Sequence, residues 1–150
     1  MPALPRLLVL TLLLLLGGYA YADQHWVELA GQRYQVEIAA DEASRNRGLM
    51  FRDAMASDRG MLFIHDETAQ QAYWMKNTRI ALDILYFDQQ RRLVSQQRDV
   101  PPCTAGDACP AYHSSRPARY VLELNAGQAY KLGLRDGAEL RFGPGIPDTP

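Results

Sequence analysis

The chain has 150 residues, of which 47% are hydrophobic, and a formal net charge of −1. This length is enough for one domain with a sizeable buried core. The near-neutral balance and the lack of a basic run argue against a nucleic-acid-binding protein, and no basic amphipathic helix points to a membrane surface.

The first 22 residues have the order of a secretory signal peptide. Arg6 supplies a thin positive region, residues 7–16 are apolar but for one Thr, and residues 20–22 (Ala-Tyr-Ala) form a small-x-small cleavage pattern. An uncleaved membrane anchor is the alternative, but the apolar run is short against the roughly 20 residues that cross a bilayer. We therefore predict cleavage before Asp23, no stable membrane anchor afterwards, and a periplasmic or secreted protein.

Short strand-like runs recur along the rest of the chain. The first two, Trp26–Leu29 and Tyr34–Ile38, flank an Ala-Gly-Gln turn and predict a hairpin. The others are Gly60–Ile64, Ala72–Met75, Ala81–Phe87, Leu93–Gln97, Tyr120–Leu124 and Glu139–Phe142. About eight short strands at this spacing predict a mostly β fold, a sandwich or small barrel.

Two short helices are predicted between the strands. Asp41 is placed to cap a helix over Glu42–Arg47. Asn125, with a Gln three residues later, resembles a capping box that starts a helix over Ala126–Leu132.

The last eight residues contain three Pro and two Gly, which disfavours both helix and strand. The organisation predicted for the chain is a signal peptide over residues 1–22, a single β-rich domain over 23–142 and a disordered tail over 143–150. Removing the signal peptide changes the net charge to −2, because that segment carries one Arg and no acid.

Two cysteines, Cys103 and Cys109, lie six positions apart in a loop-like segment. In an oxidising compartment such a pair is expected to form a disulfide, which would stabilise the fold by roughly 2 kcal/mol. A metal or redox pair is the alternative. It is disfavoured because such pairs usually have two residues between the cysteines, and this pair has five.

Five segments resemble, in order and spacing, the family named domain of unknown function 192. They are Arg45–Arg52, Gly60–Phe63, Tyr73–Thr78, Leu82–Tyr86 and Tyr120–Leu124, with Cys103 before the last. The resemblance covers nearly all of Val27–Phe142. It implies an exported protein with a compact, jelly-roll-like β domain, and it implies no reaction, because the family has no established activity.

Two acids, Asp83 and Glu123, stand inside otherwise apolar strand-like runs. Asp83 shares a strand face with Leu85 and Phe87, so we expect its carboxyl to be partly buried. A buried carboxyl needs a cation or several hydrogen bonds, or its pKa must rise. Both acids therefore have a structural interpretation, as carboxylates bonded to a loop backbone or to an Arg such as Arg47, beside the functional one.

Basic and aromatic residues near these acids complete a candidate ligand site. On a strand, Lys76 would share a face with Trp74, while Asn77 would face the other side. Lys76 could also form a cross-strand pair with Asp83. The candidate ligand-binding residues are Arg47, Trp74, Lys76, Asn77, Asp83 and Glu123.

Metal and nucleophile patterns are weak. His25, His65 and His113 are scattered without metal-ligand spacing. Most methionines after residue 22 lie in apolar runs, where Met usually fills a core, so a copper site is also disfavoured. No G-x-S-x-G nucleophile elbow and no phosphate-binding Gly-rich loop occur. We predict no metal and no cofactor.

Three functions remain open at this point. The leading hypothesis is a non-catalytic domain that binds a small molecule or a component of the cell envelope. The second is a hydrolase or lyase with Asp83 and Glu123 as an acid/base pair, which requires their carboxyl groups to lie within about 10 Å of each other. The third is a structural or partner-binding domain. The sequence does not decide whether the protein is an enzyme.

Overall fold

A computed structural model describes residues 25–147, so the predicted signal peptide lies outside the described residues. The described part has nine strands, two short α-helices and one 3-10 helix, which confirms the predicted mostly β fold. The strands are β1 (Trp26–Leu29), β2 (Gln32–Ala39), β3 (Arg59–Ala69), β4 (Ala72–Trp74), β5 (Leu82–Phe87), β6 (Leu93–Val100), β7 (Ala111–His113), β8 (Ala118–Asn125) and β9 (Leu140–Phe142). The helices are α1 (Glu42–Arg47), η1 (Gly106–Ala108) and α2 (Gln128–Lys131).

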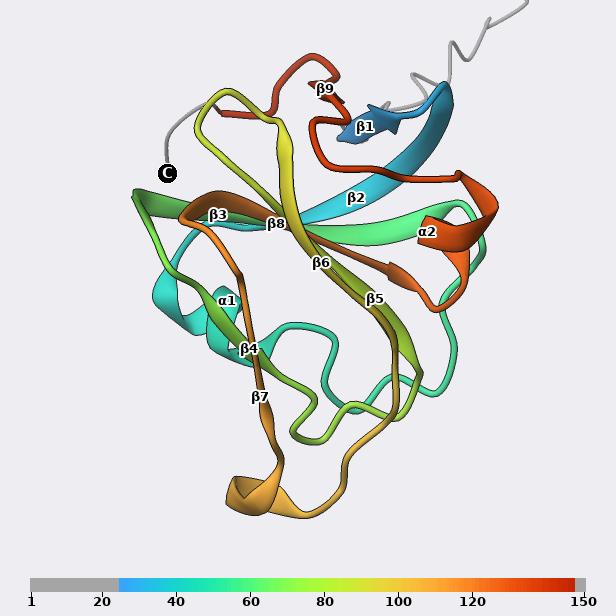
Figure 1. Ribbon diagram of the computed structural model, residues 1–150. Coiled ribbons are helices and arrows are strands. Elements are labelled where there is room, and N and C mark those ends of the chain that lie inside the picture. Colours follow the sequence, from blue (N-terminus) through green and yellow to red (C-terminus); the bar gives the residue numbers. More distant parts are fainter. Residues whose placement is uncertain (1–24, 148–150) are drawn as a thin grey trace, which may run out of the picture.

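Seven strands form one curled sheet in the order β6-β5-β8-β3-β2-β1-β9 (Figure 1). All neighbours are antiparallel except β2 and β3. The two edge strands approach each other at one end, where Arg92 and Glu139 form an isolated bridge and the Leu140 amide donates to the Arg91 carbonyl at 2.9 Å. The sheet is therefore a half-barrel. Among residues 25–147, no helix has the length and hydropathy of a membrane span.

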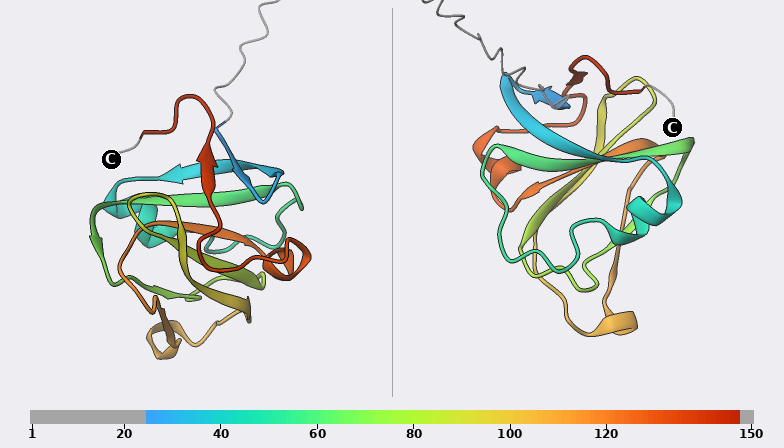
Figure 2. Two further views of the ribbon diagram at one scale, coloured as in Figure 1. Left: turned by 45° about the horizontal axis from the view of Figure 1, so that its top comes forward. Right: turned by 180° about the vertical axis from the view of Figure 1, so that it is seen from behind.

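A separate two-stranded ribbon of β4 and β7 extends from the half-barrel (Figure 1). Aromatic side chains fasten it: the Tyr86 hydroxyl of β5 donates to the Tyr112 carbonyl of β7 at 2.8 Å, and the Tyr73 ring packs edge-on against Phe63 and Tyr86. Both views in Figure 2 place α1 on the same side of the sheet as this ribbon. The predicted disulfide between Cys103 and Cys109 is formed and closes the loop around η1.

The two faces of the sheet carry two distinct apolar clusters. Leu62, Leu85 and Leu122 belong to one, and their chain neighbours Phe63 and Val121 belong to the other. This partition follows from the alternation of side chains along a strand. The strand β5, most of β8 and the first half of β3 are therefore buried on both sides.

The prediction for α1 is confirmed and the one for the start of α2 is wrong. The Asp41 carboxylate caps α1 by accepting from the Ser44 amide at 2.8 Å. At α2 the residue before the helix is Gly127, at φ +87°. Asn125 instead ends β8, and its side-chain amide donates to the Met55 carbonyl at 2.8 Å. The Asn125 side chain is therefore bonded to the Met55 carbonyl and does not cap the helix.

Residues 143–147, the start of the predicted tail, make two contacts with the sheet. The Gly143 amide donates to the Trp26 carbonyl at 2.8 Å, and Ile146 packs against the sheet core.

Asp83 of β5 is fully buried, and its carboxylate holds three elements together. One oxygen accepts from the Asp99 amide of β6 at 2.9 Å, and the other accepts from the Ala129 amide in the first turn of α2 at 2.7 Å. Backbone amides at a helix start favour a negative charge. Of the two interpretations of Asp83, the structural one, a carboxylate bonded to backbone, fits the geometry.

Replacing Asp83 by Ala should lower the free energy of unfolding by about 2–4 kcal/mol, because two buried amides lose their acceptor. Asp83→Asn keeps one acceptor oxygen and should lower the free energy of unfolding by a smaller amount. Urea unfolding followed by circular dichroism measures both, with the exposed Asp136→Ala as control. A loss within about 0.5 kcal/mol for Asp83→Ala, the usual range for surface changes, would contradict this role.

Candidate functional site

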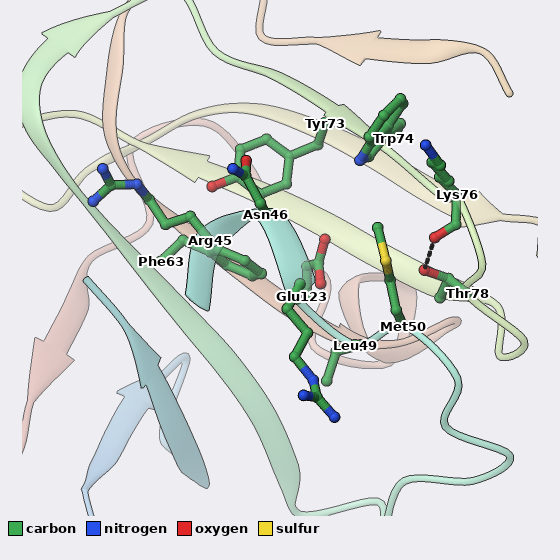
Figure 3. Close-up of a pocket in the computed structure, with 12 residues that line it drawn as sticks. Arg45, Asn46, Leu49, Met50, Phe63, Tyr73, Trp74, Lys76, Thr78 and Glu123 are labelled. Carbon is green, nitrogen blue, oxygen red and sulfur yellow. Dashed lines mark hydrogen bonds between the residues drawn. The ribbon is translucent and has the colours of Figure 1, made fainter. Parts of the chain in front are cut away.

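A small recess opens between α1, the β4–β7 ribbon and the sheet (Figure 3). Its walls come from residues 45–50, from side chains within residues 73–78, and from Phe63 and Glu123 of the sheet. The cavity volume is about 30 Å³. That space holds one or two waters, so the recess receives a small chemical group rather than a whole sugar.

Four of the six candidate residues line this recess: Arg47, Trp74, Lys76 and Glu123. Trp74 and Lys76 line it together, but the strand β4 ends at Trp74 and Tyr73 lines the recess as well, so their common position does not come from one strand face. Asn77 does not line it; its carbonyl accepts from the Phe51 amide at 2.8 Å. Asp83 also lies elsewhere.

The paired-carboxylate hypothesis is wrong in its geometry. Glu123 pairs with Ile84 in the β5–β8 register, and Asp83 pairs with Leu124. Because facing residues share a side of the sheet and neighbours alternate, Asp83 and Glu123 point to opposite faces. Sequence patterning could not reveal this, since the register between β5 and β8 depends on the whole fold.

Glu123 is the buried acid of the recess. Its side chain is 4% exposed, and within residues 25–147 it makes no side-chain hydrogen bond or ion pair, so the expected Arg47–Glu123 pair is not formed. Burial raises the pKa of the Glu123 carboxyl to about 8. Figure 3 shows this carboxyl in the middle of the recess, with Tyr73 and Asn46 on one side and Met50 on the other.

Tyr73 and Arg45 are recess residues whose polar groups are occupied. The Tyr73 hydroxyl shares a 2.8 Å hydrogen bond with His65 Nε2, and burial, followed by the nearby Glu123 charge, raises the Tyr73 pKa. Burial lowers the pKa of His65 to about 4, so this imidazole is neutral at physiological pH. Arg45 donates to the carbonyls of Ala40 at 2.5 Å and Ile64 at 3.0 Å.

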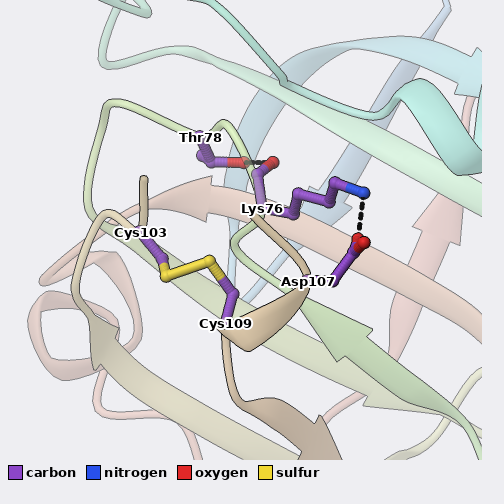
Figure 4. Close-up of a disulfide and its surroundings, with 5 residues drawn as sticks. All are labelled: Lys76, Thr78, Cys103, Asp107 and Cys109. Atoms are coloured by element: carbon purple, nitrogen blue, oxygen red, sulfur yellow. Dashed lines mark hydrogen bonds and ion pairs between the residues drawn. A yellow bond between two sulfur atoms is a disulfide. The ribbon is translucent and has the colours of Figure 1, made fainter. Parts of the chain in front are cut away.

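Arg47, a basic residue, and Trp74, whose ring is exposed, lie at the rim of the recess. Arg47 is exposed and has no side-chain partner in the described part of the chain. Trp74 is 43% exposed, and Lys76 Nζ lies 4.7 Å from its ring centroid. Lys76 is ion-paired with Asp107 of the disulfide loop, so the predicted Lys76–Asp83 pair is wrong (Figure 4).

The loops of the rim have strained backbone. Phe51 and Asn77 have φ of +65° and +54°, and the Phe51 amide bonds to the Asn77 carbonyl, so the two loops support each other. Gly48 has φ +47° and ψ −135°, a conformation that favours glycine. Such strain tends to cluster at functional sites.

Sequence reasoning missed several residues that line the recess, among them Asn46 and Tyr73, and it missed Asp107, the ion-pair partner of Lys76. Tyr73 adjoins Trp74, so the signal was present, but strand alternation alone assigned it to the opposite face. Asp107 is brought in by the disulfide loop, for which no strand pattern gives a position. No group of three or more His, Cys, Asp or Glu within residues 25–147 is arranged to hold a metal ion.

Residues 25–142 match the family model of DUF192, described as "Uncharacterized ACR". The chain belongs to this family. The DUF192 fold is also found in a crystal structure from Sinorhizobium meliloti 1021, described as that of a "putative transcription regulator". It is 35% identical, with a TM-score of 0.72, and the match covers 79% of this chain and 93% of that one. A protein of unknown function from Novosphingobium aromaticivorans DSM 12444 is 28% identical, with a TM-score of 0.71 and coverage of 79% and 83%. No curated protein matches the chain.

The raised pKa of Glu123 makes stability depend on pH. The folded state binds this proton more tightly than the unfolded chain, whose ordinary pKa is 4.5, so Glu123 lowers stability as pH rises towards about 8. The slope is at most about 1.4 kcal/mol per pH unit. His65 acts in the opposite direction, but only below its ordinary pKa of 6.5.

Urea unfolding between about pH 6.5 and pH 8.5 tests this, because Glu123→Gln should remove that decline. Glu67→Gln, the same change at an exposed acid without a side-chain partner among residues 25–147, serves as the matched control. Equal pH slopes in wild type and Glu123→Gln would show that Glu123 titrates normally.

Proposed function

We propose that this DUF192 chain is an exported domain that binds a small ligand through the recess around Glu123. The observation that carries the proposal is the partnerless carboxyl of Glu123. The Glu123 carboxyl opens on the recess, which has room for one or two waters, so the full cost of an unsatisfied buried group does not apply to it. A ligand group that fills this space can hydrogen-bond to Glu123 in a site shielded from bulk solvent, where such a bond is strengthened.

The surroundings of Glu123 support a binding site. Apolar walls from Leu49, Met50 and Phe63 enclose a few polar groups, and an exposed Trp74 lies at the rim. Small-molecule sites combine apolar walls with a few convergent polar groups in this way. The strained loops hold the rim in a defined geometry, which lowers the entropic cost of binding.

Binding is favoured over acid/base catalysis by the separation of the two carboxylates. Asp83 points away from the recess and its oxygens are occupied by backbone amides. Glu123 is then the single carboxyl of the recess, and a hydrolase that divides acid and base roles between two carboxylates lacks its second group.

Export is supported by the signal-like segment before Asp23 and by the disulfide, since disulfides persist in oxidising compartments. When the full chain is expressed in a bacterial host, we expect the protein in the periplasm or medium to begin at Asp23 and to contain no free thiol. N-terminal sequencing and thiol titration measure this. A chain that keeps Met1 in the membrane fraction would contradict export.

A ligand screen tests the binding proposal. Envelope-derived glycans, peptides and small metabolites are added to the purified protein, and thermal shift identifies binders. Arg47→Gln should lower the affinity for a ligand of the recess by roughly 10- to 100-fold, because one charge-assisted hydrogen bond is lost. Trp74→Ala should also weaken it.

Arg135→Gln is the matched control for Arg47→Gln. Arg135 is likewise exposed and without a side-chain partner in the described residues, but it lies far along the chain, after α2. Binders that lose no affinity in Arg47→Gln and Trp74→Ala would place the site elsewhere and overturn the proposal.

A further inference from the structure

We infer that the ligand of this recess carries a carboxylate group, which hydrogen-bonds to the Glu123 carboxyl while Arg47 balances its charge. The inference rests on the proposed function and names the chemical class that the same site takes.

The charges lining the recess leave one positive charge unbalanced. Arg45 lies 3.7 Å from Asp66, and Lys76 is ion-paired with Asp107. Arg47 lines the same recess and has no side-chain partner within residues 25–147. A single negative charge on the ligand completes this arrangement, whereas an ammonium group would meet an uncompensated guanidinium.

The shape of the Arg47 side chain favours a carboxylate ligand. A guanidinium presents parallel N–H donors that match the two oxygens of a carboxylate. One singly charged carboxylate also matches the charge of Arg47, the basic residue of the recess lining for which the described part of the chain supplies no side-chain partner.

Glu123 receives an anion only in its neutral form, in which it is a hydrogen-bond donor. Burial keeps the carboxyl largely protonated at neutral pH, since its pKa is raised to about 8. An O–H donor to a carboxylate oxygen is among the stronger hydrogen bonds. The ligand therefore gives the buried Glu123 the partner that the protein does not.

The other ionisable groups around Glu123 do not blur this pH dependence. They are Tyr73 on β4, Tyr86 on β5, Arg45 and Arg47 on α1, Lys76 after β4, and His65 on β3 behind Tyr73. Both tyrosines have raised pKa values, and His65 titrates near pH 4. Lys76 is ion-paired with Asp107.

The exposed face of Trp74 at the rim suits a flat, apolar ligand body behind the carboxylate. Two sources offer this chemistry: a free organic acid with an aromatic body, or the C-terminal carboxylate of a peptide ending in an aromatic residue. The experiment therefore has an arm for each.

The test is an NMR titration of the exported protein that follows the Trp74 indole N–H and the Glu123 carboxyl. The first arm compares phenylacetate with phenylacetamide and phenethylamine, which have the same body with a neutral and a cationic end. The second compares a tripeptide ending in Phe with its C-terminal amide. Inorganic phosphate is the anion control.

We expect phenylacetate, the free-acid peptide or both to bind, each at least about tenfold more tightly than its amide. Affinity should fall about tenfold between about pH 7 and pH 9 as Glu123 loses its proton. Glu123→Gln should make the affinity independent of pH, and Arg47→Gln should weaken binding at least about tenfold, with Arg135→Gln unchanged.

The outcomes separate the two proposals. If phenethylamine binds at the recess with affinity that rises with pH, or if an amide or phosphate binds better than its carboxylate counterpart, the carboxylate inference is wrong and the ligand site stands. If none of the probes shifts Trp74 or Glu123 at millimolar concentration, the carboxylate inference is wrong, and the ligand screen with Arg47→Gln and Trp74→Ala decides the proposed function.

Discussion

Antiparallel pairing between β5 and β8 decides which side of the sheet each buried acid faces, and the rest of the structure depends on that register. It places Asp83 opposite Leu124 and Glu123 opposite Ile84. Asp83 is thereby turned towards the amides of β6 and α2, where it ties the half-barrel together. Glu123 is turned to the other face, where no backbone amide or cation of the described residues meets it. One carboxyl stabilises the fold and the other is left for a ligand.

The recess forms where rigid and adjustable parts of the chain meet. The sheet contributes Glu123 and Phe63, which are held by packing on both sides. The loops that follow α1 and β4 contribute the rim, and the hydrogen bond from the Phe51 amide to the Asn77 carbonyl joins them. The disulfide loop adds Asp107, which orients Lys76 over Trp74. Binding energy at such a site comes chiefly from preorganisation, because few groups need ordering.

Local patterns predicted much of this molecule, and pairing between distant strands explains what they missed. The hairpin at β1 and β2, the Asp41 cap of α1 and the disulfide depend on neighbouring residues, so they were readable from the sequence. Four recess residues were named from local signals: Glu123 as an acid in an apolar run, Trp74 and Lys76 as an aromatic and a basic side chain two positions apart, and Arg47 as a basic side chain near a helix end. The opposite orientation of Asp83 and Glu123, the strand β7 and the partner of Lys76 are set by register and by the ribbon's docking, which no local window contains.

The proposed ligand site requires that the Glu123 carboxyl has no hydrogen-bond or ion-pair partner within the protein. Carbon-detected NMR of the side-chain carboxyl, titrated from about pH 4 to pH 10 in the absence of ligand, measures this most directly. The account predicts a midpoint near 8, because burial without a hydrogen-bond partner or cation disfavours the charged form. A midpoint at or below the ordinary value of 4.5 would show that Arg47 or another group already satisfies Glu123, and would contradict the ligand site.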